Sequence, residues 1–248
     1  MSSLKEKAAR VYAKYVVWKT TKWAAYPHKT QEKVFKKLLA KGKKTRFGKE
    51  HSFGKIVNHE DFSKQVPVRD YEGLKKYIKL ITEGEKDVLW PARPIYFAKT
   101  SGTTSGEKLI PITKESMPYH VKGSVEATMH YINETSNTSF LNKKIIFLQG
   151  SPMLEETKGI KTGRLSGIVA HYTPSFLRKN TMPSWDTNCI EDWGKKVLEI
   201  SKETLKEDMA AIGGIPPWVV MYFEKLLEIT GKKTIKQIFP NFSLFVYG

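Results

Sequence analysis

The chain has 248 residues, of which 40% are hydrophobic and 27% are charged. This composition excludes an intrinsically disordered protein, and the apolar stretches are too short for a transmembrane segment. A single cysteine, Cys189, excludes an internal disulfide, and no Cys/His cluster suggests a metal site. No apolar segment of the signal-peptide type follows Met1, so we expect a cytoplasmic protein.

The net charge of +17 is concentrated at the N-terminus, where residues 1–50 hold 15 Lys and Arg against three Glu. Such a stretch suits nucleic acid or an anionic membrane. Its apolar residues nevertheless recur at helical spacing, which predicts helices over about 4–25 and 29–41 that dock on the body of the protein. The residues expected to face inward are Leu4, Ala8, Val11, Tyr12, Tyr15, Val16, Val34, Phe35, Leu38 and Leu39.

The middle of the chain predicts short helices over 61–64 and 71–81. Two apolar runs suited to strands, 95–98 and 109–112, then enclose a loop rich in glycine and hydroxyl side chains. A helix over about 114–132 and a buried strand over 144–148 follow. Residues 149–190 show little periodicity, which predicts a long irregular stretch.

The last quarter alternates helix and strand. It predicts a helix over 191–209, a strand over 210–212, a helix that begins at two prolines and ends at Gly231, and a strand within 242–247. This alternation favours an α/β fold with a largely parallel sheet and flanking helices.

The loop from Lys99 to Lys108 carries the main chemical signal. Glycine allows a close backbone approach to a ligand, and successive N–H groups with hydroxyls form an anion-binding concavity. Lys108 adds a mobile positive charge suited to phosphate. The glycine spacing fits neither a Walker A loop nor a dinucleotide fingerprint. A phosphate-binding connection and a solvated hairpin turn both remain open. The other loop residues are Thr100, Ser101, Gly102, Thr103, Thr104, Ser105 and Gly106.

The order of hydroxyls, glycines and terminal lysine resembles the ATP-phosphate loop of adenylate-forming enzymes, the superfamily of acyl-CoA synthetases and luciferases. Residues 45–53 and 66–72 resemble segments of the plant auxin- and jasmonate-conjugating acyl-acid amido synthetases and their bacterial relatives. Residues 214–218 and 239–244 do so as well. The resemblance runs in family order from about residue 40 to the last residue.

The resemblance implies the N-terminal part of the large adenylate-forming domain. We expect residues 1–41 to form a basic helical segment docked on the body, and residues 42–248 to form an incomplete adenylation domain. The family's second nucleotide motif, its ribose-binding aspartate and its small C-terminal domain have no match here. We therefore expect a truncated fragment that does not complete the reaction alone.

The resemblance also implies the reaction. A small carboxylic acid attacks the α-phosphate of ATP, and an amino acid or other amine then displaces AMP to form an amide. Residues 100–106 would bind the β- and γ-phosphates, Lys108 would neutralise charge as the catalytic cation, and Mg²⁺ would be held through the phosphates. The acid, the amine and the oligomeric state stay open.

Several residues are weaker candidates for the acyl pocket, and each has an ordinary structural alternative. Met117 and Tyr119 lie early in the helix after the loop, where core packing is the alternative. Ser151 follows a strand end, where open α/β sheets place ligands, but it also suits a cap. Gly213 and Gly214 would allow close approach of the acid, or serve a turn. The isolated His51 and His171, and Cys189, are expected to be structural.

Two other functions compete with amide formation. An acid–thiol (acyl-CoA) ligase shares the loop, although the segments 45–53 and 66–72 argue against it. A basic module that binds nucleic acid or a membrane through residues 1–50 belongs to another class. The chain has no recognised nucleic-acid motif, so we expect no specific nucleic-acid partner.

Overall fold

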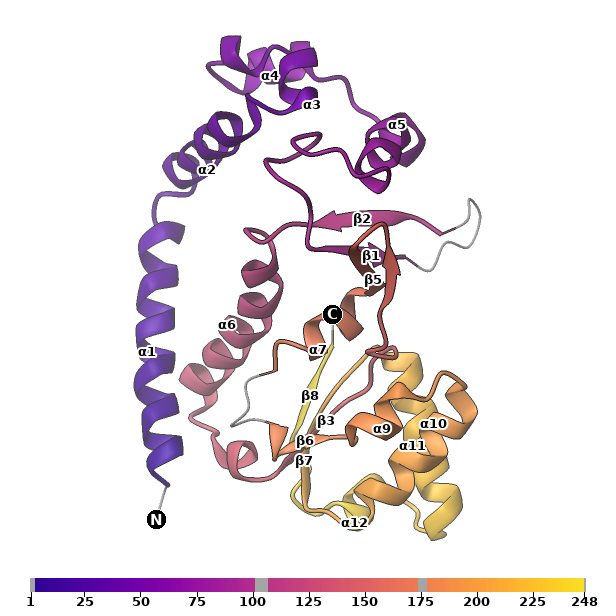
Figure 1. The fold of residues 1–248 in the computed structure, drawn as a ribbon. Helices are drawn as coiled ribbons and strands as arrows, with labels where there is room; N and C mark the ends of the chain where they lie inside the picture. Colours follow the sequence, from indigo (N-terminus) through magenta and orange to yellow (C-terminus); the bar gives the residue numbers. More distant parts are fainter. Residues whose placement is uncertain (1–2, 101–106, 174–177, 248) are drawn as a thin grey trace. The chain divides into compact units, whose positions relative to one another are not determined.

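A computed structural model describes residues 3–100, 107–173 and 178–247. The chain divides into two compact units (Figure 1). The first contains Met1–Val16, Gly123–Met153 and Arg164–Gly248, and the second contains Val17–Lys122 and Leu154–Gly163. Two of the unit boundaries fall within α1 (Leu4–Ala24) and α6 (Met117–Thr135). The other two follow Met153 and Gly163. The expected division into 1–41 and 42–248 stays a prediction.

The first unit is built on a parallel sheet with the strand order β6-β3-β7-β8. β3 pairs in parallel with β6 and with β7, and β7 pairs in parallel with the edge strand β8. Parallel neighbours require a crossover connection between the strands of each pair. The strands are β3 (Lys144–Phe147), β6 (Thr181–Met182), β7 (Met209–Gly213) and β8 (Leu244–Val246). The expected α/β class with a parallel sheet is confirmed, and β8 pairs in that sheet as predicted.

The helices of this unit begin and end at local signals in the sequence. Two prolines occupy the first turn of α11 (Pro216–Thr230), and Gly231 ends it at φ +63° in the left-handed region. Asp192 caps α10 (Trp193–Thr204) by accepting the backbone N–H of Lys195. The remaining helices are η2 (Ser139–Asn142), α7 (Leu165–Ala170), α9 (Trp185–Cys189) and α12 (Ile235–Ile238).

The main core of the first unit lies between this sheet and the pair α10 and α11. Ile146 and Ile212 from the sheet, with Ile200 and Leu226 from the helices, are fully buried in it. Burying each such side chain stabilises the fold by roughly 1.5–3 kcal/mol. This packing holds the carboxyl ends of β3 and β7 side by side.

The second unit combines small helices with a four-stranded sheet of order β2-β1-β5-β4. Asn58 and Asp70 cap α4 and α5, in line with the helices predicted there. Tyr77, Val88, Phe97 and Ile160 form its core. Its helices are α2 (Pro27–Gly42), α3 (Arg46–Glu50), η1 (Phe53–Lys55), α4 (His59–Gln65) and α5 (Tyr71–Thr82). Its strands are β1 (Tyr96–Lys99), β2 (Leu109–Ile112), β4 (Glu155–Thr157) and β5 (Ile160–Arg164).

The expectation of an irregular stretch over 149–190 is wrong. It contains the hairpin β4–β5, the strand β6 and the helices α7 and α9. The hairpin turns at Lys158 and Gly159, both at positive φ, as a two-residue turn between twisted strands requires. Elements of two to six residues are too short for a hydrophobic period to show in the sequence.

The expected inward face of the two N-terminal helices is also largely wrong. Val16 and Leu39 are buried as expected. Most of the other residues have exposed side chains, with exposed fractions of 49% or more for all of these except Ala8: Leu4, Ala8, Val11, Tyr12, Tyr15, Val34 and Leu38. In α1 the buried side is instead made of small residues, with Ala13 and Val16 at its centre. Helical spacing identified a stripe of apolar residues but not which side of the helix the protein covers.

Candidate functional site

The loop proposed to bind phosphate connects two paired antiparallel strands. β1 and β2 pair in register from Tyr96 opposite Ile112 to Lys99 opposite Leu109. The N–H of Thr100 then donates to the carbonyl of Lys108 at 3.1 Å, which extends the ladder by one pair. This confirms the predicted strand–loop–strand unit and excludes a Walker A arrangement, in which a helix follows the loop.

The centre of this loop lies outside the described residues. It comprises six of the seven predicted phosphate-binding residues: Ser101, Gly102, Thr103, Thr104, Ser105 and Gly106. Their role stays a prediction. The structure describes the residues on either side of this segment, which we call the two stems of the loop. The first stem ends at Thr100, and the second begins with Glu107 and Lys108.

Lys99, at the first stem, is engaged by two carboxylates. Its Nζ lies 2.7 Å from Glu155 Oε2 on β4 and 3.3 Å from Glu107 Oε1. The hydrogen bond with Glu155 raises the pKa of Lys99, and Glu107 adds to this while burial opposes it. Lys99 is therefore paired with carboxylates on β4 and on the second stem of the loop. This leaves Lys108 as the better phosphate ligand of the two.

Lys108, at the second stem, lies over an aromatic ring. Its Nζ is 5.5 Å from the ring centroid of Tyr71 at the start of α5, within the range of a cation–π contact. The Tyr71 hydroxyl accepts the N–H of Leu109 at 2.9 Å. Tyr71 thus holds both the backbone and the side chain at the end of the loop. Sequence reasoning missed this role, although Tyr71 stands within the segment 66–72 that carried the family resemblance.

Replacing Tyr71 with phenylalanine is expected to lower the free energy of unfolding by about 1 kcal/mol, because the N–H of Leu109 loses its acceptor. Urea unfolding followed by circular dichroism measures the change. Tyr119→Phe is the matched control, since the Tyr119 side chain is 65% exposed, and we expect about 0.5 kcal/mol or less from it. Equal losses in both variants would show that the Tyr71 hydroxyl contributes nothing specific.

Two of the segments that carry the resemblance, 45–53 and 66–72, meet through a histidine. Arg69 Nη2 donates to His51 Nε2 at 2.9 Å, and His51 Nδ1 donates to the Phe47 carbonyl at 2.8 Å. These partners place the imidazole proton on Nδ1. The His51 and Phe47 rings also stack with centroids 4.1 Å apart. These contacts agree with the structural role expected for His51.

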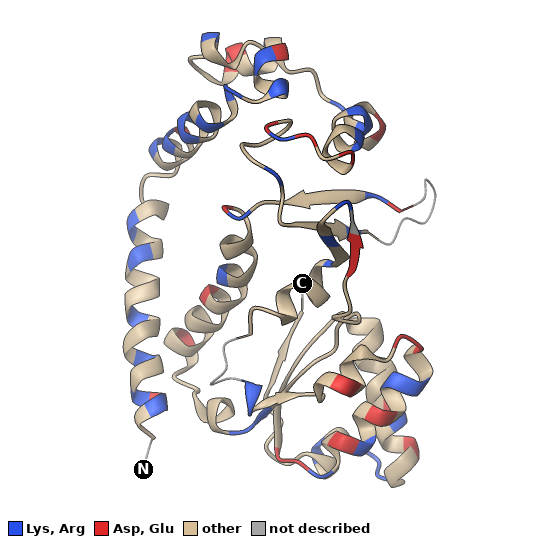
Figure 2. Cartoon of the chain, in the orientation of Figure 1, with Lys and Arg blue, Asp and Glu red and all other residues tan. Residues whose placement is uncertain are grey.

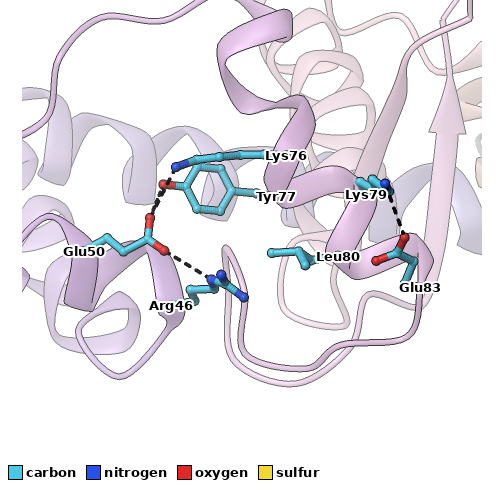
Figure 3. A pocket seen from close by; sticks show the side chains of 7 residues that line it. All are labelled: Arg46, Glu50, Lys76, Tyr77, Lys79, Leu80 and Glu83. Carbon is cyan, nitrogen blue, oxygen red and sulfur yellow. Dashed lines mark hydrogen bonds and ion pairs between the residues drawn. The ribbon is translucent and has the colours of Figure 1, made fainter.

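A pocket of about 270 Å³ opens beside the same segments, between α3 and α5 (Figure 3). Its charged side chains pair among themselves: Arg46 with Glu50 at 3.1 Å, and Lys79 with Glu83 at 3.8 Å. The hydrogen bond from Tyr77 lowers the pKa of Glu50, which keeps this carboxylate ionised. The lining contains no predicted site residue, and its cations are already neutralised, so we do not assign the pocket to phosphate binding.

Three acyl-pocket candidates, Ser151, Gly213 and Gly214, lie at or just after the carboxyl ends of β3 and β7. Ser151 donates to the Cys189 carbonyl and accepts the N–H of Met153, both at 3.3 Å. A Cβ on Gly213 would lie 2.8 Å from the Phe147 ring, and one on Gly214 would lie 3.0 Å from Leu148 Cβ. A side chain at either glycine would crowd Phe147 or Leu148, which accounts for both glycines whether or not they approach a ligand.

The other two candidates do not share a surface. Met117 is buried, with 2% of its area exposed, whereas Tyr119 is 65% exposed. The burial of Met117 agrees with core packing, the structural alternative named above. His171 Nε2 donates to the Pro152 carbonyl at 2.8 Å. The acyl-pocket assignment stays a prediction for all five residues.

A buried lysine beside the β3 end was missed by sequence reasoning. Lys196 on α10 is 2% exposed, and its Nζ donates to the carbonyls of Gln149 at 3.0 Å and Asn188 at 2.6 Å. Burial lowers the pKa of Lys196 to about 8. Its burial could have been predicted from helical spacing, because Lys196 lies three residues after Trp193 and four before Ile200, on the apolar face of α10. Lys196 fixes the chain that leads to Ser151.

The burial of Lys196 is expected to make stability depend on pH. Between pH 8 and 10.5 the folded chain releases this proton while the unfolded chain still holds it. The unfolded state then binds more protons, so stability rises with pH. Between about pH 7 and about pH 9.5, the free energy of unfolding of the natural chain should rise by about 2 kcal/mol relative to that of Lys196→Met.

Urea titrations at the two pH values measure this gain. Lys195→Met is the control, because Lys195 is the exposed neighbour on the same helix and should show no pH-dependent difference from the natural chain. A pH-independent difference between the natural chain and Lys196→Met would contradict the lowered pKa.

A model described as the GH3 family N-terminal domain matches residues 19–193. The chain belongs to the GH3 family. It is 34% identical over 93 residues to the indole-3-acetic acid-amido synthetase GH3.2 of Arabidopsis thaliana, and the aligned region covers 37% of this chain and 17% of that protein. It is 35% identical over 96 residues to the synthetase GH3.15 of the same plant, covering 38% and 16%. The matched part is thus less than a fifth of the length of these relatives.

Solved structures extend the match in fold. The AtGH3.15 acyl acid amido synthetase in complex with 2,4-DB superposes with a TM-score of 0.64 at 20% identity, over 80% of this chain and 35% of that one. A second GH3.15 structure gives 0.63 at 21% identity over 80% and 36%. The family and fold implied by the sequence resemblance are confirmed. Among the described residues, no helix is long and apolar enough to cross a membrane.

Proposed function

We propose that this GH3 protein catalyses the ATP-dependent adenylation of a small carboxylic acid, followed by amide formation with an amino acid or another amine. The observation that carries the proposal is the loop of glycines and hydroxyls between β1 and β2, closed by Lys108. The names of the relatives, indole-3-acetic acid-amido synthetases, support it.

The first step transfers the adenylyl group. A carboxylate oxygen attacks the α-phosphorus of ATP, the bond to the β-phosphate oxygen breaks, and pyrophosphate leaves. The carboxylate is already ionised, so this step needs no general base. The loop donates N–H and O–H groups to the β- and γ-phosphate oxygens, where negative charge accumulates on the leaving group. Lys108 neutralises part of that charge in this proposal, and its Nζ lies 5.5 Å from the Tyr71 ring centroid.

Mg²⁺ reaches the site with the nucleotide in this proposal. The described residues contain no group of three or more His, Cys, Asp or Glu side chains placed to hold a metal ion. Mg²⁺ keeps several waters and is commonly bound through substrate phosphates, which this arrangement fits. In the second step the amine nitrogen attacks the acyl carbon, AMP leaves with the electrons of the acyl–oxygen bond, and the amine gives up a proton.

The test measures each step separately, on the 248-residue chain and on the complete product of its gene. Isothermal titration measures Mg-ATP binding, and carboxylate-dependent ATP–pyrophosphate exchange measures adenylation with a panel of aryl, indole and alkanoic acids. Amino acids and coenzyme A then compete as acceptors. Exchange that requires both Mg²⁺ and an acid, followed by an amide product, supports the proposal. A thioester product, or absence of nucleotide binding in both proteins, contradicts it.

A further inference from the structure

Several apolar side chains of helix α1 are exposed, and four of them lie on one side of the helix. Leu4 is 85% exposed, Val11 70%, Tyr15 51% and Trp18 53%. Their positions i, i+7, i+11 and i+14 place them along one line of the helix. Ala13 and Val16, on the other side, are buried at 0% and 4% exposure. We call Leu4, Val11, Tyr15 and Trp18 the apolar stripe.

Helix α1 carries many basic residues and almost no acidic ones (Figure 2). α1 carries six basic residues and one acid, Glu6, which accepts a hydrogen bond from Asn142 on the covered side. By helical spacing, Lys7 and Lys14 flank one edge of the stripe and Lys19 the other. Lys22 continues its line, with Nζ 3.6 Å from the Trp18 ring centroid.

This pattern distinguishes between possible partners. A nucleic-acid backbone would pair with the lysines but would leave Leu4 and Val11 in water, without any favourable contact. A lipid headgroup region satisfies both sets of side chains: lysines meet anionic headgroups, aromatic rings lie at the boundary, and aliphatic side chains reach the acyl chains. The charge of the helix specifies an anionic surface.

We propose that α1 binds the surface of an anionic lipid bilayer, lying in its plane with the apolar stripe inserted among the headgroups. The inference is independent of amide synthesis. It gives the basic N-terminal segment a role as a peripheral membrane contact. The apolar face that helical spacing predicted for the core becomes the face that meets lipid.

The experiment is cosedimentation of the 248-residue chain with vesicles. Phosphatidylcholine vesicles are compared with vesicles of phosphatidylcholine mixed with phosphatidylserine, and binding is expected only to the mixture. Val11→Ser with Tyr15→Ser should weaken binding by about tenfold or more, because two side chains lose their burial. Lys7→Gln with Lys14→Gln should weaken it by a similar factor and reduce its salt dependence.

The matched control is Val68→Ser with Tyr247→Ser, which removes one valine and one tyrosine that are 101% and 70% exposed elsewhere. It should bind as the natural chain does, and thermal melts verify that every variant is folded. Equal binding of the stripe variant and the control overturns the proposal, as does equal binding to neutral vesicles. Retention on DNA without vesicle binding, or self-association that the stripe variant abolishes without vesicle binding, assigns the face to another partner and overturns it too.

Discussion

Replacing Thr103 and Thr104 together with alanine is expected to slow carboxylate-dependent ATP–pyrophosphate exchange by at least about a hundredfold, with little change in melting temperature. Removing one preorganised donor from a comparable oxyanion site costs on the order of 3–4 kcal/mol of transition-state stabilisation. A surface hydroxyl contributes roughly 0.5 kcal/mol or less to folding. The two measurements therefore separate a phosphate-binding loop from an ordinary hairpin turn.

The exchange assay uses the complete gene product, with a thermal melt of each variant beside it. Thr21→Ala with Thr128→Ala is the matched control, because both hydroxyls are exposed and donate to carbonyls of their own helices. Lys108→Ala should cause a loss similar to that of the double variant. Exchange at nearly the natural rate in the Thr103 and Thr104 variant would mean that the loop is only a turn, and the nucleotide assignment would fail.

Replacing Gly48 with alanine is expected to destabilise the fold by at least about 3 kcal/mol, at the upper end of the cost of overpacking. A Cβ at this position would lie 2.1 Å from the Gly42 carbonyl oxygen and 2.9 Å from its carbon. Both are backbone atoms, so no side-chain rotation relieves the clash. The same oxygen accepts the N–H of Thr45 at 2.9 Å and its hydroxyl at 2.7 Å. Alanine would therefore also disturb the N-cap of α3.

Gly54→Ala is the matched control for this variant, six residues further along the same segment. A Cβ there meets nothing within 4 Å, so alanine should change the free energy of unfolding by less than about 0.5 kcal/mol. Urea unfolding followed by circular dichroism compares the two. Similar stability of the Gly48 and Gly54 variants would show that α2 and α3 are not held as closely as the structure has them.

Residues close in sequence were enough to predict many elements. The cap at Asp70, the prolines at the start of α11 and the left-handed Gly231 each act within one or two turns of their helix. The apolar runs of β1 and β2 likewise predicted their strands. The strand–loop–strand unit, the parallel sheet and the family resemblance therefore followed from local patterns and motif order.

Motifs and periodicity in the sequence were enough to indicate the family, the alternation of helices and strands, and the chemistry of the loop between β1 and β2. The three-dimensional contacts were needed to show which face of α1 is covered, that Lys196 is buried against the Gln149 carbonyl, and that the Tyr71 hydroxyl accepts the N–H of Leu109. Caps, turns and helical periods act over a few residues. Burial and hydrogen bonding at these sites depend on partners 38 and 47 residues away, and no local pattern encodes a contact made across that distance.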